Sequence, residues 1–215
     1  FSRMAVGYFF LSGFESIKEK LDKVKNLKLL IGNRTNQNTI EELVKGHLHK
    51  EMIEIELRKQ SRLTNSQKED VLTETSEGYS TDLETIEQNN VNEAGISALW
   101  ELVRDKKLDV RVYTKGTLHS KTYLFDLPDK DYLEGIAIIG SSNLSISGLK
   151  NNSELNVIVT NPNDYKEVQT WFDKLWNESE DFNEMFMNFI KESWVQKKVS
   201  PYDIYIKTLY NLVKD

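Results

Sequence analysis

The alternation of short apolar runs with amphipathic helical segments constrains this fold most. Residues 4–10 (MAVGYFF) are rich in Val, Tyr and Phe and predict a buried strand. Apolar residues then recur at helical spacing through 14–24, and the run LKLLI at 27–31 predicts a second strand. Strand, helix and strand in this order form a βαβ unit, so we expect these two strands to pair in parallel.

The rest of the chain continues the same alternation. Further strands are predicted at 110–114, 120–125, 135–139 and 156–160. Helices are predicted at 40–57, 96–106, 165–176, 181–191 and 201–214. The sequence therefore predicts an α/β domain with a mixed, largely parallel sheet flanked by helices.

One segment, residues 61–93, differs from this pattern because it is polar, acidic and poor in large apolar groups. We expect an exposed excursion there, partly disordered or with one short helix. It holds eight acidic and two basic residues, a difference equal to the whole chain's net charge of −6. The negative balance, which argues against a nucleic-acid partner, therefore belongs to this excursion and leaves the remainder neutral.

Composition excludes several classes of protein. The chain has no cysteine, so disulfides, thiolate zinc sites and cysteine nucleophiles are excluded. No apolar run approaches the roughly 20 residues that span a bilayer, and no signal peptide is visible. We expect a cytoplasmic protein, and a start at Phe1 is typical of a fragment of a longer chain.

The residues suited to catalysis gather between 118 and 157, in the order His119, Lys121, Asp126, Gly140-Ser141-Ser142-Asn143 and Glu154. Side chains two apart on a strand share a face, so an imidazole and an ammonium would project together. Lysine neutralises phosphate oxygens, and histidine can attack phosphorus or carry a proton.

The later part of this set completes a phosphate site. Its small residues would let a ligand approach the backbone, Asn143 offers an amide donor, and Glu154 would orient an imidazole. A lone H-x-K is more often a surface strand and a lone GSSN more often a turn. The ordered set is much more specific than either piece.

These residues resemble a known family. HSKTYLFD followed by GSSNLSISGLKNNSELNV resembles the HKD motif of the phospholipase D superfamily. GYFFLSGF, LKLLIGN and LDVRVYTKGTLHSK resemble the phospholipase-D-like domain at the N-terminus of bacterial Swi/Snf-type DNA helicases. SPYDIYIKTLYNLVKD resembles the segment that joins this domain to the motor. The resemblance implies a phosphodiesterase domain at 1–200 and a helical linker at 201–215 toward a helicase motor that this chain lacks.

Two features depart from the family pattern. The spacer 127–139 between Asp126 and Gly140 holds thirteen residues, more than the family usually has, and we expect an extended hairpin there. The chain also carries a single HKD set. His47 and His49 stand two apart on a predicted helix, where they would face different directions, so we expect solvated side chains rather than a metal pair.

The resemblance implies a mechanism. Two HKD sets share one active site in this superfamily, so a single-set chain is expected to form a homodimer. One His119 would form a phosphohistidine and the other would act as general acid, while Lys121 and Asn143 stabilise charge and Glu154 orients His119. Ser141, Ser142 and Lys115 would bind substrate. Asp126 would support the site, and neither a metal nor another cofactor is implied.

The expected substrate is DNA, because the likeness is to helicase-linked domains. Basic side chains outnumber acidic ones before the motif, at Arg104, Lys106, Lys107, Arg111, Lys115 and Lys121 against Asp105 and Asp109. Lys106 and Lys107 are equally well explained as the end of a helix.

The sequence leaves two alternatives to a nuclease function and two possible roles for the tryptophans. A catalytically weak DNA-binding and dimerisation module is the alternative to a nuclease. A lipid transferase is disfavoured because no amphipathic membrane segment or apolar anchor is evident, and we expect no membrane contact. Packing in the core or an interface is favoured over base stacking for Trp171, Trp176 and Trp194.

Overall fold

The computed structural model describes residues 1–7, 9, 11, 24–33, 63–116, 118–127, 133–141, 155–196, 205, 206 and 209. The helices predicted at 14–24, 40–57 and 201–214, and the histidines of the second of these segments, lie wholly or almost wholly outside the described residues.

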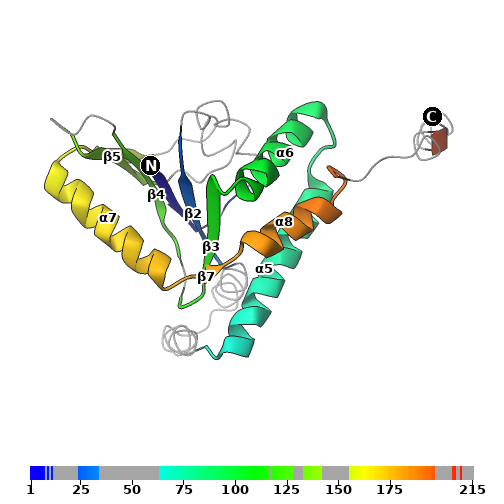
Figure 1. Cartoon of the computed structure of the whole chain (residues 1–215), viewed down its shortest axis with the longest axis horizontal. Coiled ribbons are helices and arrows are strands. Elements are labelled where there is room, and N and C mark those ends of the chain that lie inside the picture. Colours follow the sequence, from blue (N-terminus) through cyan, green and yellow to red (C-terminus); the bar gives the residue numbers. More distant parts are fainter. Residues whose placement is uncertain are drawn as a thin grey trace.

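A seven-stranded sheet forms the centre of the molecule, in the order β6-β5-β4-β1-β2-β3-β7 (Figure 1). The strands are β1 (Ser2–Val6), β2 (Leu27–Gly32), β3 (Leu108–Tyr113), β4 (Lys121–Asp126), β5 (Gly135–Gly140), β6 (Asn156–Val159) and β7 (Glu180–Asp181). Each strand predicted from the sequence is present, the first of them shifted toward the N-terminus.

The expected α/β class and mixed sheet are confirmed, but the sheet is not largely parallel. The pair β1–β2 is parallel, as the βαβ pattern predicted, and β2–β3 is also parallel. The other four neighbouring pairs are antiparallel. Short connections such as 127–134 reverse the chain, and only long crossovers return it to the same direction. The expected hairpin is also present, since the Leu127 N–H donates to the Glu134 carbonyl at 3.2 Å.

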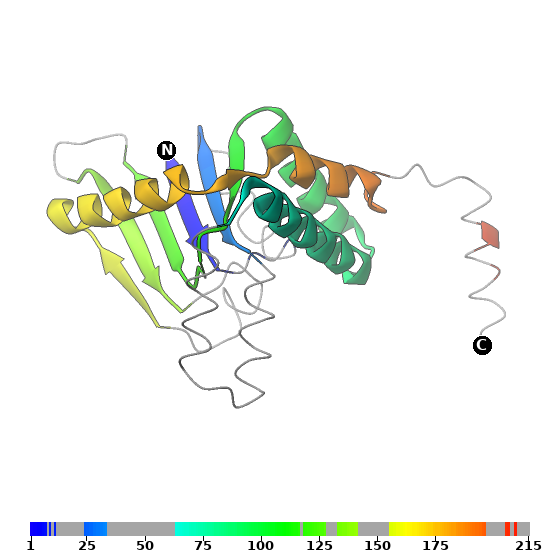
Figure 2. The ribbon, with the colours of Figure 1, turned by 90° about the horizontal axis from the view of Figure 1, so that it is seen from below.

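Four described helices cover the two faces of the sheet: α5 (Asn65–Thr85), α6 (Asn90–Arg104), α7 (Pro162–Asn177) and α8 (Asn183–Glu192). Helices α5, α6 and α8 lie on one side and α7 lies on the other (Figures 1 and 2). Each face of the sheet has its own hydrophobic core, and alternate residues of β2 contribute to the two. Leu29 and Ile31 pack toward α5, α6 and α8, whereas Leu30 packs under α7. None of the described helices is both long and apolar enough to cross a membrane.

The segment predicted as an exposed excursion at 61–93 is exposed over much of its described length, but it forms the 21-residue helix α5 rather than disorder or one short helix. Thr64 begins α5 with a capping box, in which its Oγ1 accepts from the Gln67 N–H and the Gln67 side chain accepts from the Thr64 N–H. Tyr79 and Leu83 are buried, and the Tyr79 ring stacks on Phe189 of α8 at 5.9 Å. Only about one residue per helical turn of α5 faces the core, so the average hydropathy of the segment stays polar and hides this stripe.

The end of α6 decides the role of the two lysines that follow it. Lys106 adopts a φ of 57°, its N–H bonds the Val103 carbonyl, and the Lys107 N–H bonds the Leu102 carbonyl. This is the Schellman arrangement that terminates helices. Lys106 and Lys107 therefore serve the helix end.

Lys106→Gly is expected to stabilise the protein by about 1 kcal/mol, because glycine adopts positive φ without the steric cost that a side chain carries. Urea unfolding measures the gain. Lys107→Gly is the matched control, since positive φ occurs only at Lys106 among the described non-glycine residues. Equal effects at the two positions would contradict this account.

Candidate active site

One edge of the sheet, at the carboxyl ends of β1, β2 and β3, brings together His119, Lys121 and Ser141 of the HKD pattern. Lys121, the first residue of β4, lies opposite Val6, near the end of β1. Because β5 runs antiparallel to β4, its last residue, Gly140, reaches the same edge opposite Asn156 of β6. Segments at residues 6–7, 119–121, 140–141 and 155–156 thus meet at one place.

His119 is exposed and lies two residues before β4, rather than within a strand as expected. Its backbone crosses close to the ends of β1 and β2. The Gly7 N–H donates to the Ser120 carbonyl at 2.8 Å. A Cβ on Gly7 would clash with the Leu118 carbonyl oxygen and lie 3.2 Å from the His119 Cα, and a Cβ on Gly32 would lie 2.6 Å from the Gly7 oxygen. Glycine at both positions therefore lets the His119 segment sit against the sheet.

Lys121 remains beside His119 in space. Its Nζ lies 3.5 Å from the main-chain oxygen of His119, so the ammonium turns back toward the histidine rather than along the strand. A lysine ammonium close to a histidine is suited to binding phosphate oxygens.

Ser141 holds the neighbouring segment in place. Its Oγ accepts from the Leu155 N–H at 3.0 Å, and its own N–H donates to the Leu155 carbonyl at 3.1 Å. These bonds hold Leu155, the residue after Glu154 in the sequence, beside Ser141. Ser141 thus has a structural task in addition to the substrate contact predicted for it.

The remaining predicted site residues divide into two groups. Ser142, Asn143 and Glu154 lie outside the described residues. Lys115 is exposed and follows the last residue of β3, so it lies at the same end of the strands as Gly7 and Lys121.

Asp126 lies away from this edge, which corrects its expected place near the site. It ends β4, about 17 Å along the strand from Lys121 at 3.4 Å per residue. Its Oδ1 accepts from Arg3 Nη1 at 2.8 Å and from the Tyr165 hydroxyl of α7. Burial opposes ionisation, but these two hydrogen bonds outweigh it and hold the pKa of Asp126 below its ordinary value. Asp126 therefore ties α7 to the sheet.

Tyr165→Phe is expected to cost about 1 kcal/mol at pH 7, since a hydrogen bond to a carboxylate is lost. Because the pKa of Asp126 is lower in the folded protein than in the unfolded chain, its ionised carboxylate stabilises the fold at pH values above the unfolded pKa. This contribution is lost as the pH falls through the folded pKa. The difference between wild type and variant should therefore shrink below about pH 4. Urea unfolding at the two pH values tests this; a difference independent of pH would contradict it.

The basic residues between Arg104 and Lys121 do not form one continuous surface. Arg104 pairs with Asp105 at 2.9 Å, and with Lys106 and Lys107 it lies at the start of β3, the far edge from His119. Arg111, in the middle of the strand, donates to the Trp176 carbonyl and lies over that indole ring at 4.9 Å. Lys115 and Lys121 are the cations of this set that stand at the carboxyl edge.

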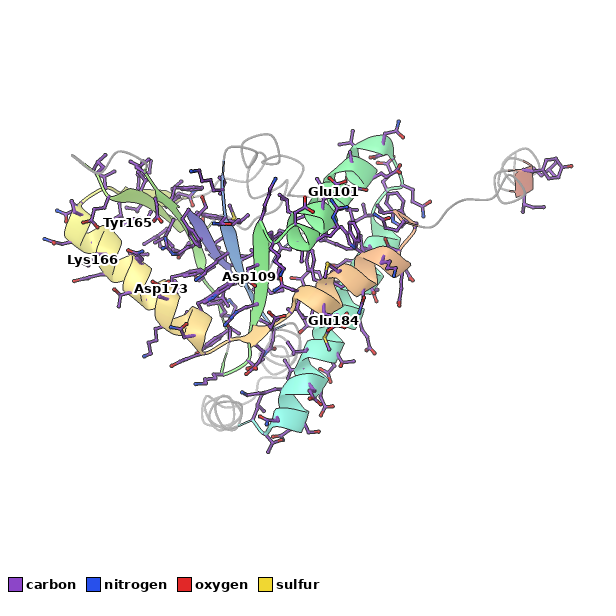
Figure 3. The ribbon with its side chains drawn as sticks, in the orientation of Figure 1. Glu101, Asp109, Tyr165, Lys166, Asp173 and Glu184 are labelled. Carbon is purple, nitrogen blue, oxygen red and sulfur yellow. The ribbon has the colours of Figure 1, made fainter. Side chains whose placement is uncertain are left out.

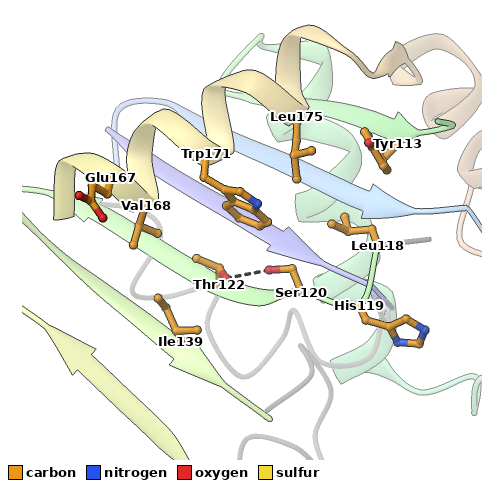
Figure 4. A pocket seen from close by; sticks show the side chains of 10 residues that line it. All are labelled: Tyr113, Leu118, His119, Ser120, Thr122, Ile139, Glu167, Val168, Trp171 and Leu175. Atoms are coloured by element: carbon orange, nitrogen blue, oxygen red, sulfur yellow. Dashed lines mark hydrogen bonds between the residues drawn. The ribbon is translucent and has the colours of Figure 1, made fainter. Parts of the chain in front are cut away.

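A groove of about 640 Å³ runs between α7 and the sheet and ends at His119 (Figure 4). Its lining residues come from β3, β4, β5, α7 and the segment 118–120 that precedes β4. They are Tyr113, Leu118, His119, Ser120, Thr122, Ile139, Glu167, Val168, Trp171 and Leu175. Burial, followed by the nearby Glu178 carboxylate, raises the pKa of Tyr113. Its phenol therefore stays protonated at neutral pH.

Sequence reasoning missed this groove, and its treatment of the tryptophans holds only in part. Trp176 is 4% exposed, as expected for a core residue, but Trp171 is 38% exposed and lines the groove. The two positions are five residues apart, about 140° around the axis of α7, whose side chains are drawn in Figure 3. The rings therefore leave the helix in different directions, and only the packing of α7 on the sheet decides which of them is covered.

Comparison with known proteins identifies the family. Residues 14–176 match the family model described as "Cardiolipin synthase, PLD-like domain". This match covers most of the chain, so the chain belongs to the phospholipase-D-like family. It is a phosphodiesterase domain of that superfamily.

Two solved structures are similar to this chain. The phospholipase D family member Nuc from Salmonella typhimurium is 14% identical, with 84% of this chain and 80% of that chain covered and a TM-score of 0.41. The phosphatidylserine synthase of Haemophilus influenzae Rd KW20 is 12% identical, with 99% of this chain and 39% of that chain covered and a TM-score of 0.43. Neither likeness extends to substrate or partner. No curated protein matches the chain.

Proposed function

We propose that this domain hydrolyses phosphodiester bonds of DNA without a metal, at a site shared by two copies of the chain. The observation that supports it most is the meeting of His119, Lys121 and Ser141 at one edge of the sheet. An exposed imidazole beside a lysine ammonium is suited to nucleophilic attack on a phosphodiester.

The reaction proceeds in two displacements. In the first, an imidazole nitrogen of one His119 bonds to phosphorus, and the second His119 protonates the departing oxygen. In the second, that histidine takes a proton from water, the water oxygen bonds to phosphorus, and the phosphohistidine bond breaks. Lys121 and Asn143 stabilise charge on the non-bridging oxygens, and Glu154 orients His119.

The need for two copies follows from counting histidines. The chain contains three, of which His119 alone belongs to an HKD set. A two-fold homodimer supplies the second, and its interface uses the same patch on both subunits. Because His119, Lys121 and Ser141 lie at one edge, that edge must face the dimer axis.

DNA and a fused helicase motor are the favoured context, supported by the likeness to Swi/Snf-type helicase domains over much of the chain. Lys115 and Lys121 at the edge provide cations for a phosphate backbone. The alternative is a catalytically weak DNA-binding and dimerisation module, which the long spacer 127–139 favours.

Incubation of the protein with single- and double-stranded DNA in EDTA tests this proposal, beside His119→Ala. We expect cleavage by the wild type only. Equal DNA binding by both proteins without cleavage would support the binding module instead. Release of headgroups from phosphatidylglycerol vesicles, with DNA left intact, would overturn the DNA assignment. Sedimentation as a monomer would overturn the shared site.

A further inference from the structure

The groove beside α7 has a lining that phosphoryl transfer does not use. Its volume of about 640 Å³ lies in the range of small-ligand sites. Most of its walls are apolar, and His119 stands at one end (Figure 4). A molecule held at His119 by a phosphate group therefore has a second compartment beside it.

Trp171 is the main feature of this compartment. Its ring extends from α7 over the groove toward Ser120 and Thr122 (Figure 4). It is 38% exposed, whereas Trp176, five residues later on the same helix, is 4% exposed. An indole left open to solvent beside a catalytic histidine presents a flat face for a second ring.

We propose that this groove is a nucleobase subsite, in which Trp171 stacks on the base next to the scissile phosphate of a single-stranded nucleic acid. This inference rests on the proposed nuclease function and specifies its substrate. A paired base keeps both faces stacked within the duplex, so only an unpaired base reaches the indole.

Polar groups in the groove favour a base over an acyl chain. Glu167 lies one helical turn before Trp171 and lines the same groove. Its carboxylate accepts hydrogen bonds from the exocyclic amino group of a base and repels phosphate, which keeps the backbone at the His119 end. The Ser120 and Thr122 hydroxyls, 2.7 Å apart, add further hydrogen-bonding capacity. A hydrocarbon chain would use none of these groups.

The experiment compares two short single-stranded oligodeoxynucleotides of equal length and charge, one natural and one built wholly from abasic residues. Binding is measured with His119→Ala, which removes turnover, so the result does not depend on cleavage. We expect the natural strand to bind about 10- to 100-fold more tightly, the range for stacking on one aromatic side chain. Trp171→Leu in the same background keeps an apolar side chain but removes the stacking face, and should abolish the preference.

Two controls separate the causes of failure. Trp171→Phe keeps a ring and should retain most of the preference, and Thr170→Ala alters an exposed neighbour on α7 whose hydroxyl bonds only its own helix. Equal binding of both strands, or a preference that survives Trp171→Leu, would overturn the subsite even if the wild type cleaves DNA. Binding to phosphatidylglycerol vesicles that Trp171→Ala abolishes and Trp171→Leu retains would show an acyl-chain site instead. Base-dependent binding without cleavage would leave the subsite standing and overturn the nuclease.

Discussion

His119→Ala is expected to lower phosphodiester hydrolysis by at least about 1000-fold, because the nucleophile and the general acid are lost together. Hydrolysis of a nitrophenyl phosphodiester in EDTA measures the loss. A wild-type reaction stopped completely by EDTA would contradict the metal-independent mechanism. A variant with residual activity within tenfold of wild type would exclude His119 as the nucleophile.

Mixing the wild-type protein with His119→Ala tests whether one site contains His119 from both subunits. If a site needs His119 from each subunit, a heterodimer is inactive and activity falls with the square of the wild-type fraction. If each chain acts alone, activity falls in direct proportion. Unfolding and refolding the mixture together ensures exchange of subunits, and a linear dependence would overturn the shared site.

Gly7→Ala is expected to reduce turnover by about 100-fold, the typical cost of misplacing a catalytic group by about 1 Å. A Cβ there meets the Leu118 carbonyl and the His119 backbone, so the His119 segment must move away from the sheet. We also expect a loss of about 1–3 kcal/mol in the free energy of unfolding, as for other overpacked sites.

Gly116→Ala is the matched control for this prediction. Gly116 lies just beyond β3 near the same edge, but the nearest atom to its added Cβ is Tyr113 Cε1 at 3.9 Å, an ordinary contact. Activity should therefore change little. Full activity in Gly7→Ala, or equal losses in the two variants, would show that the close approach does not position His119.

Prediction from sequence succeeded where the signal lies within a few residues. The run at 27–31 became β2, and the helical periodicity at 165–176 became the centre of α7. It failed at α5, because a sparse stripe around Tyr79 and Leu83 is masked by polar neighbours. It also failed on strand direction, which depends on connection length and on which edge each strand joins.

The candidate site shows the same division. The order and spacing of His119, Lys121 and Ser141 could be recognised from the sequence, because the chemistry requires those residue types close together along the chain. Asp126 belonged to the same pattern, yet the direction of β4 carries it to the opposite edge of the sheet, where it binds Arg3 and Tyr165.

The sequence by itself determined the family resemblance, the βαβ beginning and the residues suited to phosphoryl transfer. Tertiary structure alone decided that Gly7 supports the His119 backbone, that the basic stretch is divided between two edges, and that Trp171 stays open above a groove. The physical reason is the distance along the chain over which each kind of interaction acts. Propensity and periodicity act between neighbours in the chain, whereas burial and close approach depend on segments that only folding brings together.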